Sequence, residues 1–317
     1  MKTVIIDNNK TDIKPCVATI GFFDGVHRGH KFLIDYIKGI AKNKGLESTV
    51  VTFDKHPRQV LKSDYMPKML STYDEKILLL SKTGVDNCAV LPFNKETSSL
   101  SAYDFMKDIL RDRLNVKVLV TGYDNRFGHN RSEGFDDYVR FGRELGIEVL
   151  PAQAFVLNGV NVSSSVVRTY LEKGEVEMAA FCLGYPYFIT GKVVNGCHNG
   201  RKLGFPTANI EINDSDKLIP AKGVYAVKAR TQNSLEQRRA MMNIGTCPTF
   251  GGDKVSLEAH ILNFKNDIYD EQLAVSFCHR IRSERKFDNA EDLTQQLLTD
   301  EKMVNEQFDK ENDFLDV

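Results

Sequence analysis

The chain has 317 residues, of which 42% are hydrophobic, and a formal net charge of −1. This length allows two domains with a core each, and the near-neutral charge excludes a general basic surface for nucleic acid or membranes. Six cysteines lie scattered without a CxxC pair, which favours free thiols over disulfides or a zinc site. Because residues 1–14 lack a signal-peptide core and no apolar run could span a bilayer, we expect a cytoplasmic protein without nucleic-acid or membrane partners.

The first half of the chain alternates predicted strands with predicted helices. Apolar, β-branched runs mark the strands, and two of the helical patterns open with the capping signals Thr72-x-x-Glu75 and Ser101-x-x-Asp104. This alternation indicates a parallel sheet covered by helices, in which ligands bind beyond the carboxyl ends of the strands. The expected strands are residues 16–20, 47–53, 88–93, 117–121 and 147–151, and the expected helices are residues 28–42, 74–82, 102–114 and 135–145.

The segment 21–30, GFFDGVHRGH, joins the first predicted strand to the first predicted helix. A helix N-terminus carries unpaired N–H groups and partial positive charge, which suit a phosphate. His27 and His30 are three positions apart, so both imidazoles can reach the same anion, and Gly25 and Gly29 let the backbone approach a ligand closely. The alternative is a tight turn with two surface histidines.

Three later stretches also contain residues that suit phosphate or ligand contacts. Residues 52–57, TFDKHP, end the second predicted strand and include His56, and residues 122–134 carry arginines beside glycines. Ser163 and Ser164 stand at a predicted helix start, and Arg168 one turn later offers a fork of donors to the same anion. The alternatives are polar surface loops for the first two stretches and an ordinary N-cap for the third.

The sequence pattern changes near residue 185, where consecutive short strands replace the alternation with helices. Such a run argues for an antiparallel barrel or sandwich. We therefore predict two domains, 1–184 and 185–317, and a packing stripe of Leu293, Leu297 and Met303 on the final helix. The expected strands are residues 188–194, 223–230, 239–244, 256–264 and 273–281, and the expected final helix is residues 290–310.

The second domain contains two further stretches with candidate chemistry. Residues 191–209 run from GKVVNG through GR to LGFPTAN, and Gly196, Gly200 and Arg201 suit a loop that closes over phosphates. Glu258 and His260 lie on one face of a predicted strand. The alternative for residues 191–209 is a turn held by proline, and the alternative for Glu258 and His260 is an exposed ion-pairing couple.

Both sets of motifs resemble those of bifunctional riboflavin kinase/FAD synthetases. Segment 21–30 resembles the GxFDGxHxGH signature of HxGH nucleotidyltransferases, residues 52–57 the TFxPHP motif, and residues 122–134 the GxDFRFGxxRxG motif. Residues 163–168 resemble SSTxIR, residues 191–209 resemble GxVxxGxxxGRxLGFPTAN, and residues 258–264 resemble ExHxxxF. The resemblance implies a Rossmann-like N-terminal nucleotidyltransferase domain with a parallel sheet, and a C-terminal antiparallel β-barrel riboflavin kinase domain with a terminal helix.

The resemblance also implies the reactions and the roles of individual residues. The second domain would phosphorylate riboflavin to FMN with ATP, and the first would adenylylate FMN to FAD with release of pyrophosphate, with Mg²⁺ serving both steps. The resemblance implies catalytic roles for His27, His30, Arg168 and Glu258, with Glu258 as the base for the ribityl hydroxyl. It implies magnesium binding by Thr207 and Asn209. Phosphate contacts are implied for Gly21, Phe22, Phe23, Asp24, Gly25, Gly29, Ser163, Ser164, Gly196, Gly200 and Arg201, and flavin contacts for His56, Asp124, Arg126, Phe127, Arg282 and Glu284.

Departures from the family patterns include Lys55, Asn125, Asn263 and Asp270. Those at Asn125, Asn263 and Asp270 leave open a flavin-binding regulator that has lost catalysis. A nucleotidyltransferase for another phosphorylated acceptor is a second alternative, but it leaves residues 206–209 and 258–260 without a purpose. The oligomeric state is also open, including weak self-association.

Overall fold

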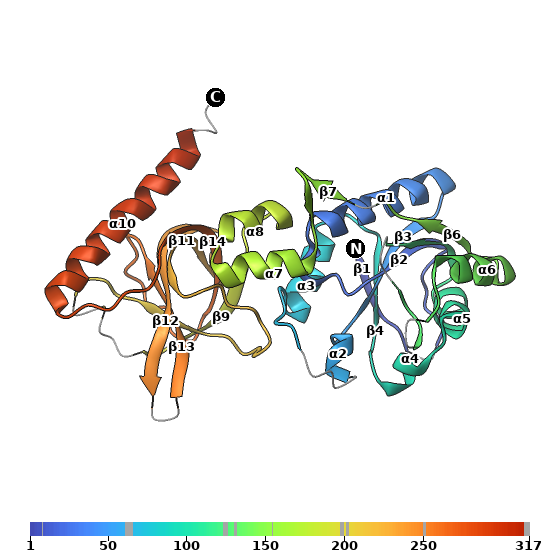
Figure 1. Cartoon of the computed structure of the whole chain (residues 1–317), viewed down its shortest axis with the longest axis horizontal. Helices are drawn as coiled ribbons and strands as arrows, with labels where there is room; N and C mark the ends of the chain where they lie inside the picture. The colour runs from blue at the N-terminus through green and yellow to red at the C-terminus, as the bar shows by residue number, and fades with distance from the viewer. Residues whose placement is uncertain are drawn as a thin grey trace. The chain divides into compact units, whose positions relative to one another are not determined.

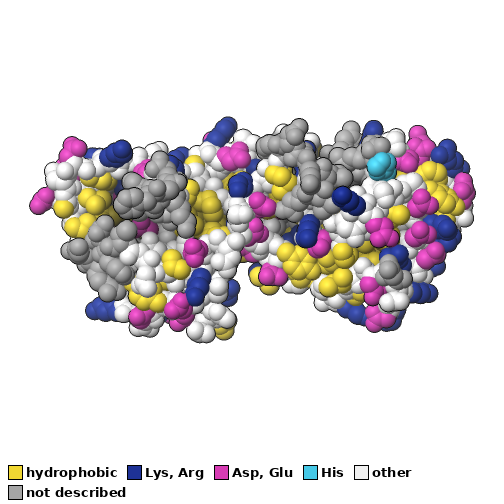
Figure 2. All heavy atoms as spheres, turned by 90° about the horizontal axis from the view of Figure 1, so that it is seen from below, with side chains coloured by type: hydrophobic (Ala, Val, Ile, Leu, Met, Phe, Trp, Pro, Cys, Tyr) yellow, Lys and Arg dark blue, Asp and Glu magenta, His cyan; other side chains and the backbone are white. Residues whose placement is uncertain are grey.

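The computed structural model describes residues 1–317 except 8, 61–65, 123–125, 130–131, 154, 197–199, 201–202, 250–251 and 314–317, and except the side chains of 59–60, 247–249, 252–254 and 311–313. The chain divides into two compact units, Met1–Ser164 and Ser165–Val317 (Figure 1). Acidic and basic side chains intermingle on the face drawn in Figure 2, as the near-neutral net charge predicts. No described helix combines the length and apolarity needed to cross a membrane.

The first unit is built on a six-stranded sheet with the strand order β1-β4-β3-β2-β5-β6, in which every pair is parallel. All five residues of β2 and of β4 are buried, as expected for strands covered on both faces. The parallel sheet predicted from the alternating pattern is thus confirmed. The strands are β1 (Lys2–Ile5), β2 (Cys16–Ile20), β3 (Glu47–Phe53), β4 (Asn87–Leu91), β5 (Val116–Thr121) and β6 (Glu148–Pro151).

The helices of the first unit begin largely where the sequence predicted. Thr72 and Glu75 form a reciprocal capping box at the start of α3, because each side chain accepts from the other's backbone N–H. The predicted helix 102–114 instead begins as α5 and continues as a π-helix, η2. A π-helix has i→i+5 hydrogen bonds, and the spacing of apolar residues does not distinguish it from an α-helix. The elements are η1 (Asp24–Val26), α1 (Arg28–Lys44), α2 (Pro57–Val60), α3 (Tyr73–Ser81), α4 (Lys95–Ser99), α5 (Ala102–Asp104), η2 (Phe105–Arg113), α6 (Phe135–Leu145), and the hairpin β7 (Val156–Leu157) and β8 (Val160–Asn161).

The second unit is a closed antiparallel barrel with the strand order β10-β13-β12-β11-β14-β9. This confirms the predicted barrel and adds the short strand β10, which the sequence pattern did not indicate. Its elements are α7 (Ser164–Lys173), α8 (Val176–Leu183), β9 (Phe188–Val194), β10 (Ala208–Glu211), β11 (Gly223–Thr231), β12 (Arg238–Thr249), β13 (Gly252–Ile261), β14 (Gln272–Arg282) and α10 (Ala290–Asp313).

Helix α10 packs on the barrel through a face that includes Leu297 of the predicted stripe but not Met303. Val304 and Phe308 are buried in a cluster with barrel residues, and Leu297 packs against that cluster, whereas Met303 is 36% exposed. The prediction for Met303 is wrong because the buried face follows residues 297, 304 and 308, which the helical period places together.

Helices α7 and α8 belong by their contacts to the barrel unit. Ala221 donates its backbone N–H to Leu171 O at 2.9 Å, and Arg280 donates to Lys173 O at 2.9 Å and to the Glu177 carboxylate at 3.0 Å. The compact unit therefore begins at Ser165, before the change in sequence pattern near residue 185. The functional boundary between residues 184 and 185 stays a prediction.

Candidate active sites in the two units

The motif 21–30 begins at the point of the sheet where the strand order reverses. Strand β2 lies between β3 and β5, and the chain proceeds from β3 to β4 on one side and from β5 to β6 on the other. Loops that leave such a point in opposite directions part to form a crevice. Gly21 and Gly122, which follow β2 and β5, line a cavity of about 360 Å³ there.

The two histidines of the motif stack on each other at the start of α1. His27 is the N-cap residue of α1, and its Nδ1 accepts the backbone N–H of His30 at 3.3 Å. Their ring centroids are 3.6 Å apart with 17° between the planes. Because His27 Nδ1 accepts a hydrogen bond, its proton resides on Nε2, which makes this imidazole a neutral donor.

His30 is also held in the neutral form. Burial, followed by the neighbouring His27, lowers the pKa of His30 well below 6.5. Its Nδ1 is buried and has no hydrogen-bond partner among the described residues. A buried polar atom without a partner is costly unless a ligand meets it, and His30 lines the cavity.

Gly29 packs closely against His27 and against the backbone that follows β8. A Cβ at this position would lie 3.2 Å from the His27 ring and 3.3 Å from Val162 O. Asp24, in contrast, fixes the turn: its buried carboxylate accepts the N–H groups of Leu70 and Ser71, both at 3.0 Å. These bonds occupy the carboxylate, which has no donor of its own for a phosphate.

The cavity of the first unit gathers most of the residues predicted to bind phosphate. Ser164, the last residue of the first unit, also donates its hydroxyl to Asp24 O of the motif at 3.0 Å. Sequence reasoning missed Gln153, Phe155 and Asn161, although Gln153 follows the carboxyl end of β6, where such a sheet presents ligand contacts. The predicted residues that line the cavity are Gly21, Phe22, Phe23, His27, Gly29, His30, Ser163 and Ser164.

The predicted flavin contacts of the first unit are distributed differently. His56 meets the edge of the cavity residue Phe22, with ring centroids 4.7 Å apart and 77° between the planes. Phe127 instead stacks on Tyr138 with ring centroids 4.2 Å apart within the core, and its predicted flavin contact stays a prediction. Arg126 is exposed, and Asp124 lies outside the described residues.

Arg168 lies on α7 within the barrel unit, whereas His27 and His30 belong to the first unit. Its predicted contact with the phosphates of the first site stays a prediction. Arg201 lies outside the described residues, so its predicted phosphate contact also stays a prediction.

The second unit brings Thr207, Asn209 and Glu258 together on the barrel. Asn209 and Glu258 are direct partners in the register of β10 and β13. The hydroxyls of Ser256 and Thr207 hydrogen-bond to the Glu258 carboxylate, yet burial outweighs them and raises the pKa of Glu258. A Cβ at Gly196 would lie 2.1 Å from Asn209 Nδ2, so a larger residue there would have to displace the Asn209 amide.

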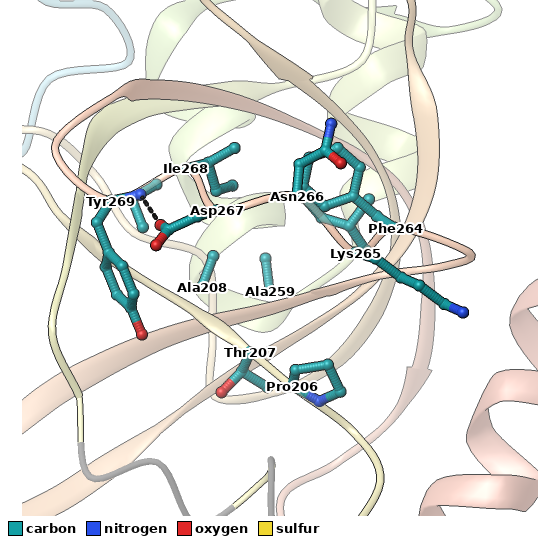
Figure 3. Close-up of a pocket in the computed structure, with 12 residues that line it drawn as sticks. Pro206, Thr207, Ala208, Ala259, Phe264, Lys265, Asn266, Asp267, Ile268 and Tyr269 are labelled. Carbon is teal, nitrogen blue, oxygen red and sulfur yellow. Dashed lines mark hydrogen bonds between the residues drawn. The ribbon is translucent and has the colours of Figure 1, made fainter.

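Two cavities meet at Thr207. One, of about 230 Å³, is lined by Glu258 and by apolar side chains that include Phe205, Leu293 and Leu297. The other, of about 160 Å³, is lined by Pro206, Thr207 and the segment 264–269 (Figure 3). In Figure 3 Thr207 and Tyr269 border this cavity, and a hydrogen bond of 3.0 Å from Tyr269 N to the Asp267 carboxylate shapes its loop.

The predicted flavin residues of the second unit line the larger of these cavities. Arg282 is bound by Asp300, since its Nε and Nη2 donate to that carboxylate at 2.9 Å and 2.7 Å, and Nη1 donates to Ser283 O. Glu284 lies against Gly245, where a Cβ would come within 2.6 Å of its carboxylate. Sequence reasoning missed Asp300 and Asn243. No sequence signal identified Asp300, because its burial depends on the packing of α10 against the barrel.

The parallel-sheet unit has a cavity with a histidine pair, and the barrel unit has two cavities that share Thr207, one of them lined by Glu258. Together they define a transferase with two separate sites. Family models agree with this division: FAD synthetase matches residues 9–166 and riboflavin kinase matches residues 183–308.

Known relatives match along nearly the whole chain. The bifunctional riboflavin kinase/FMN adenylyltransferase of Escherichia coli (strain K12) is 36% identical over 293 residues, which cover 92% of this chain and 93% of that protein. The protein of the same name from Listeria monocytogenes is 38% identical and covers 99% and 100%. A crystal structure titled macrolide-efflux protein from Streptococcus pneumoniae has a TM-score of 0.86, 31% identity, and coverage of 96% and 99%. The chain belongs to the family of bifunctional riboflavin kinase/FMN adenylyltransferases, which confirms the resemblance seen in the motifs.

Proposed function

We propose that the chain makes FAD from riboflavin in two ATP-dependent steps. The unit Ser165–Val317 phosphorylates riboflavin to FMN, and the unit Met1–Ser164 transfers an adenylyl group from ATP to FMN. Family membership supports both activities, and the position of Thr207 between two cavities, hydrogen-bonded to Glu258, is the observation on which the kinase assignment rests.

In the kinase step, the two cavities that share Thr207 receive the two substrates. The flavin occupies the cavity with apolar walls and Glu258, and the ATP phosphates enter from the cavity bordered by Tyr269. This arrangement places acceptor and donor on opposite sides of the transferred group, as in-line displacement requires. Glu258 takes the proton of the ribityl 5′-hydroxyl, whose oxygen bonds to the γ-phosphorus while ADP leaves. Its raised pKa makes it a stronger base than an exposed glutamate.

The donors around Glu258 suit Mg²⁺. The Thr207 hydroxyl, the Asn209 amide oxygen and the Glu258 carboxylate are hard oxygen ligands, and the register of β10 and β13 brings them together. Thr207 and Asn209 hold the ion beside the ATP phosphates in this proposal. When bound, Mg²⁺ neutralises charge that develops on the phosphate oxygens.

In the adenylyl transfer, the FMN phosphate attacks the α-phosphorus of ATP and the bond to pyrophosphate breaks. His27 and His30, as neutral donors, stabilise the charge of the leaving group together with the N–H groups at the start of α1. Ser163 and Ser164 approach the same phosphates from the other wall of the cavity. Arg168 adds a guanidinium to this set.

The flavin contacts divide between the units. His56 borders the FMN end of the first cavity through its contact with Phe22. Glu284 faces the flavin of the kinase site, whereas Arg282 acts as a positioning residue through Asp300. Riboflavin, FMN and ATP are the small-molecule partners. A cytoplasmic location is in keeping with buried free thiols at Cys16, Cys88, Cys182 and Cys278.

Incubation with riboflavin, ATP and Mg²⁺, followed by chromatography of flavins over time, tests the proposal. We expect FMN to accumulate first and FAD to follow. Flavin binding without any turnover would contradict the proposal and favour the regulator that the departures in sequence left open.

A further inference from the structure

Lys76 on α3 is a buried lysine without a role in the reactions above. It is 2% exposed and ranks among the largest fully buried side chains of the protein. Its Nζ donates to Phe53 O at 2.7 Å and lies 4.0 Å from the centroid of the Phe22 ring. A lysine is almost never buried so completely unless its charge is matched by specific partners.

The partners of Lys76 belong to the wall of the first site. Phe22 lines the cavity that contains His27 and His30, and the Phe22 ring also contacts the ring of His56 edge-on. Phe53 ends β3 immediately before the turn that carries His56. A single ammonium group thus joins the motif 21–30 to the segment 53–56.

The helix that carries Lys76 is itself fixed to the motif. Asp24 accepts the N–H groups of Leu70 and Ser71, and the Ser71 hydroxyl accepts the N–H of Gly25 at 3.0 Å. Ser71 directly precedes Thr72, the N-cap residue of α3, so these bonds hold the start of α3 against η1. The Lys76 side chain is therefore directed at Phe22 from a rigid base.

The electrostatic surroundings keep Lys76 charged near neutral pH and neutral at higher pH. Burial lowers the pKa of Lys76 to about 8, against the raising effects of the carboxylates of Asp24 and Asp54. Asp24 lies on η1, Asp54 follows β3, and Cys88 lies on β4, where burial raises the pKa of its thiol to about 11. The Cys88 thiol is therefore neutral throughout the range in which Lys76 titrates.

We propose that Lys76 is a positioning residue for the adenylyl transfer, which holds Phe22 and the turn with His56 in place through its cation–π contact and its bond to Phe53 O. This inference rests on the proposed function of the first unit. The contact of an ammonium with an aromatic face is strong when desolvated, and it fixes the ring that faces the ligand. Small displacements of such a wall reduce the rate of a reaction that depends on in-line placement.

The test compares the wild type with Lys76→Met, Lys76→Arg and the control Lys82→Met, an exposed lysine that follows the same helix. FAD formation from FMN and ATP is measured from pH 6.5 to pH 10, with riboflavin phosphorylation by the same preparation as an internal measure of intact enzyme. FAD formation by the wild type establishes the proposed function separately from the role of Lys76.

We expect Lys76→Met to lower kcat/KM for FMN roughly 10-fold to 100-fold at pH 7, with unchanged riboflavin phosphorylation. In the wild type FAD formation falls as pH rises through about 8, because Lys76 is cationic only below its pKa. Lys76→Met lacks this fall. Lys76→Arg keeps activity to higher pH, since a guanidinium stays charged.

A Lys76→Met enzyme with wild-type kcat/KM would overturn the inference, and so would a Lys76→Arg enzyme that is inactive or declines at the same pH as the wild type. If Lys76→Met does not fold, the profiles of the wild type and Lys76→Arg decide between the outcomes.

Discussion

Replacement of Asp300 by asparagine tests how α10 is held to the barrel. Asp300 is fully buried, and its carboxylate receives two nitrogens of Arg282 and the Gln296 amide, the latter at 2.8 Å. The Asp300→Asn variant would keep the size of the side chain but leave the Arg282 charge without a counterion. Loss of one partner of a buried ion pair costs about 3–5 kcal/mol, and the lower value applies here because the Arg282 side chain is 20% exposed.

A loss of about 3 kcal/mol lowers the unfolding midpoint of a unit of this size by roughly 6–12 °C. Calorimetry measures the midpoint, and riboflavin phosphorylation should fall with it because Leu293 and Leu297 of the same helix line the kinase cavity. FAD formation from FMN should persist. Glu306→Gln, which removes an exposed contact to Lys302 on the same helix, is the matched control and should change the midpoint little.

The reasoning about Asp300 also predicts the behaviour of a double variant. Arg282→Met combined with Asp300→Leu removes both charges and should recover most of the lost stability, as apolar replacements of buried pairs often do. An Asp300→Asn protein with the wild-type midpoint, or a double variant as unstable as the single one, would refute the account of this ion pair.

Substitutions of His30, Glu258 and Gly29 probe the two sites. His30→Ala should abolish FAD formation but not FMN formation. Buried His30 stays neutral, whereas the same residue in the unfolded chain gains a proton below about pH 6.5, so the stability of the wild-type first unit falls with decreasing pH. His30→Gln should reduce that fall, which melting curves at acid pH can show. Glu258→Gln should lower riboflavin phosphorylation roughly 100-fold to 10,000-fold and spare FAD formation from FMN; an unchanged rate would remove its role as base. Gly29→Ala should lower FAD formation roughly 10-fold to 100-fold by displacing His27. Gly39→Ala on the same helix, where a Cβ meets nothing within 4 Å, should leave it unchanged.

Much of the fold follows from local sequence. The bounds of β2, β3 and α6 coincide with the predicted ones because the strands are sharply bounded apolar or β-branched runs and the helix has a clear amphipathic period. The short strand β10 escaped prediction because its four residues have no periodicity of their own and form only by pairing with β9 and β13.

The candidate sites were predictable where a motif fixes backbone geometry, and less so where tertiary packing decides. His27, His30 and Gly29 belong to one turn, so their proximity is a local property. Lys76 and Asp300 acquire their partners only across the fold, and sequence alone offers no reason to expect either to be buried. The burial of Phe127 in the core is likewise a matter of tertiary packing that its motif did not reveal.

The division of labour between the two units is tested most directly by mixing His30→Ala and Glu258→Gln proteins. Each variant alone should fail to convert riboflavin to FAD, the first stopping at FMN and the second before it. The mixture, supplied with riboflavin, ATP and Mg²⁺, should produce FAD, because FMN released by one protein is a substrate for the other. A mixture that yields no FAD, although each variant retains its remaining activity, would contradict two independent sites linked by free FMN.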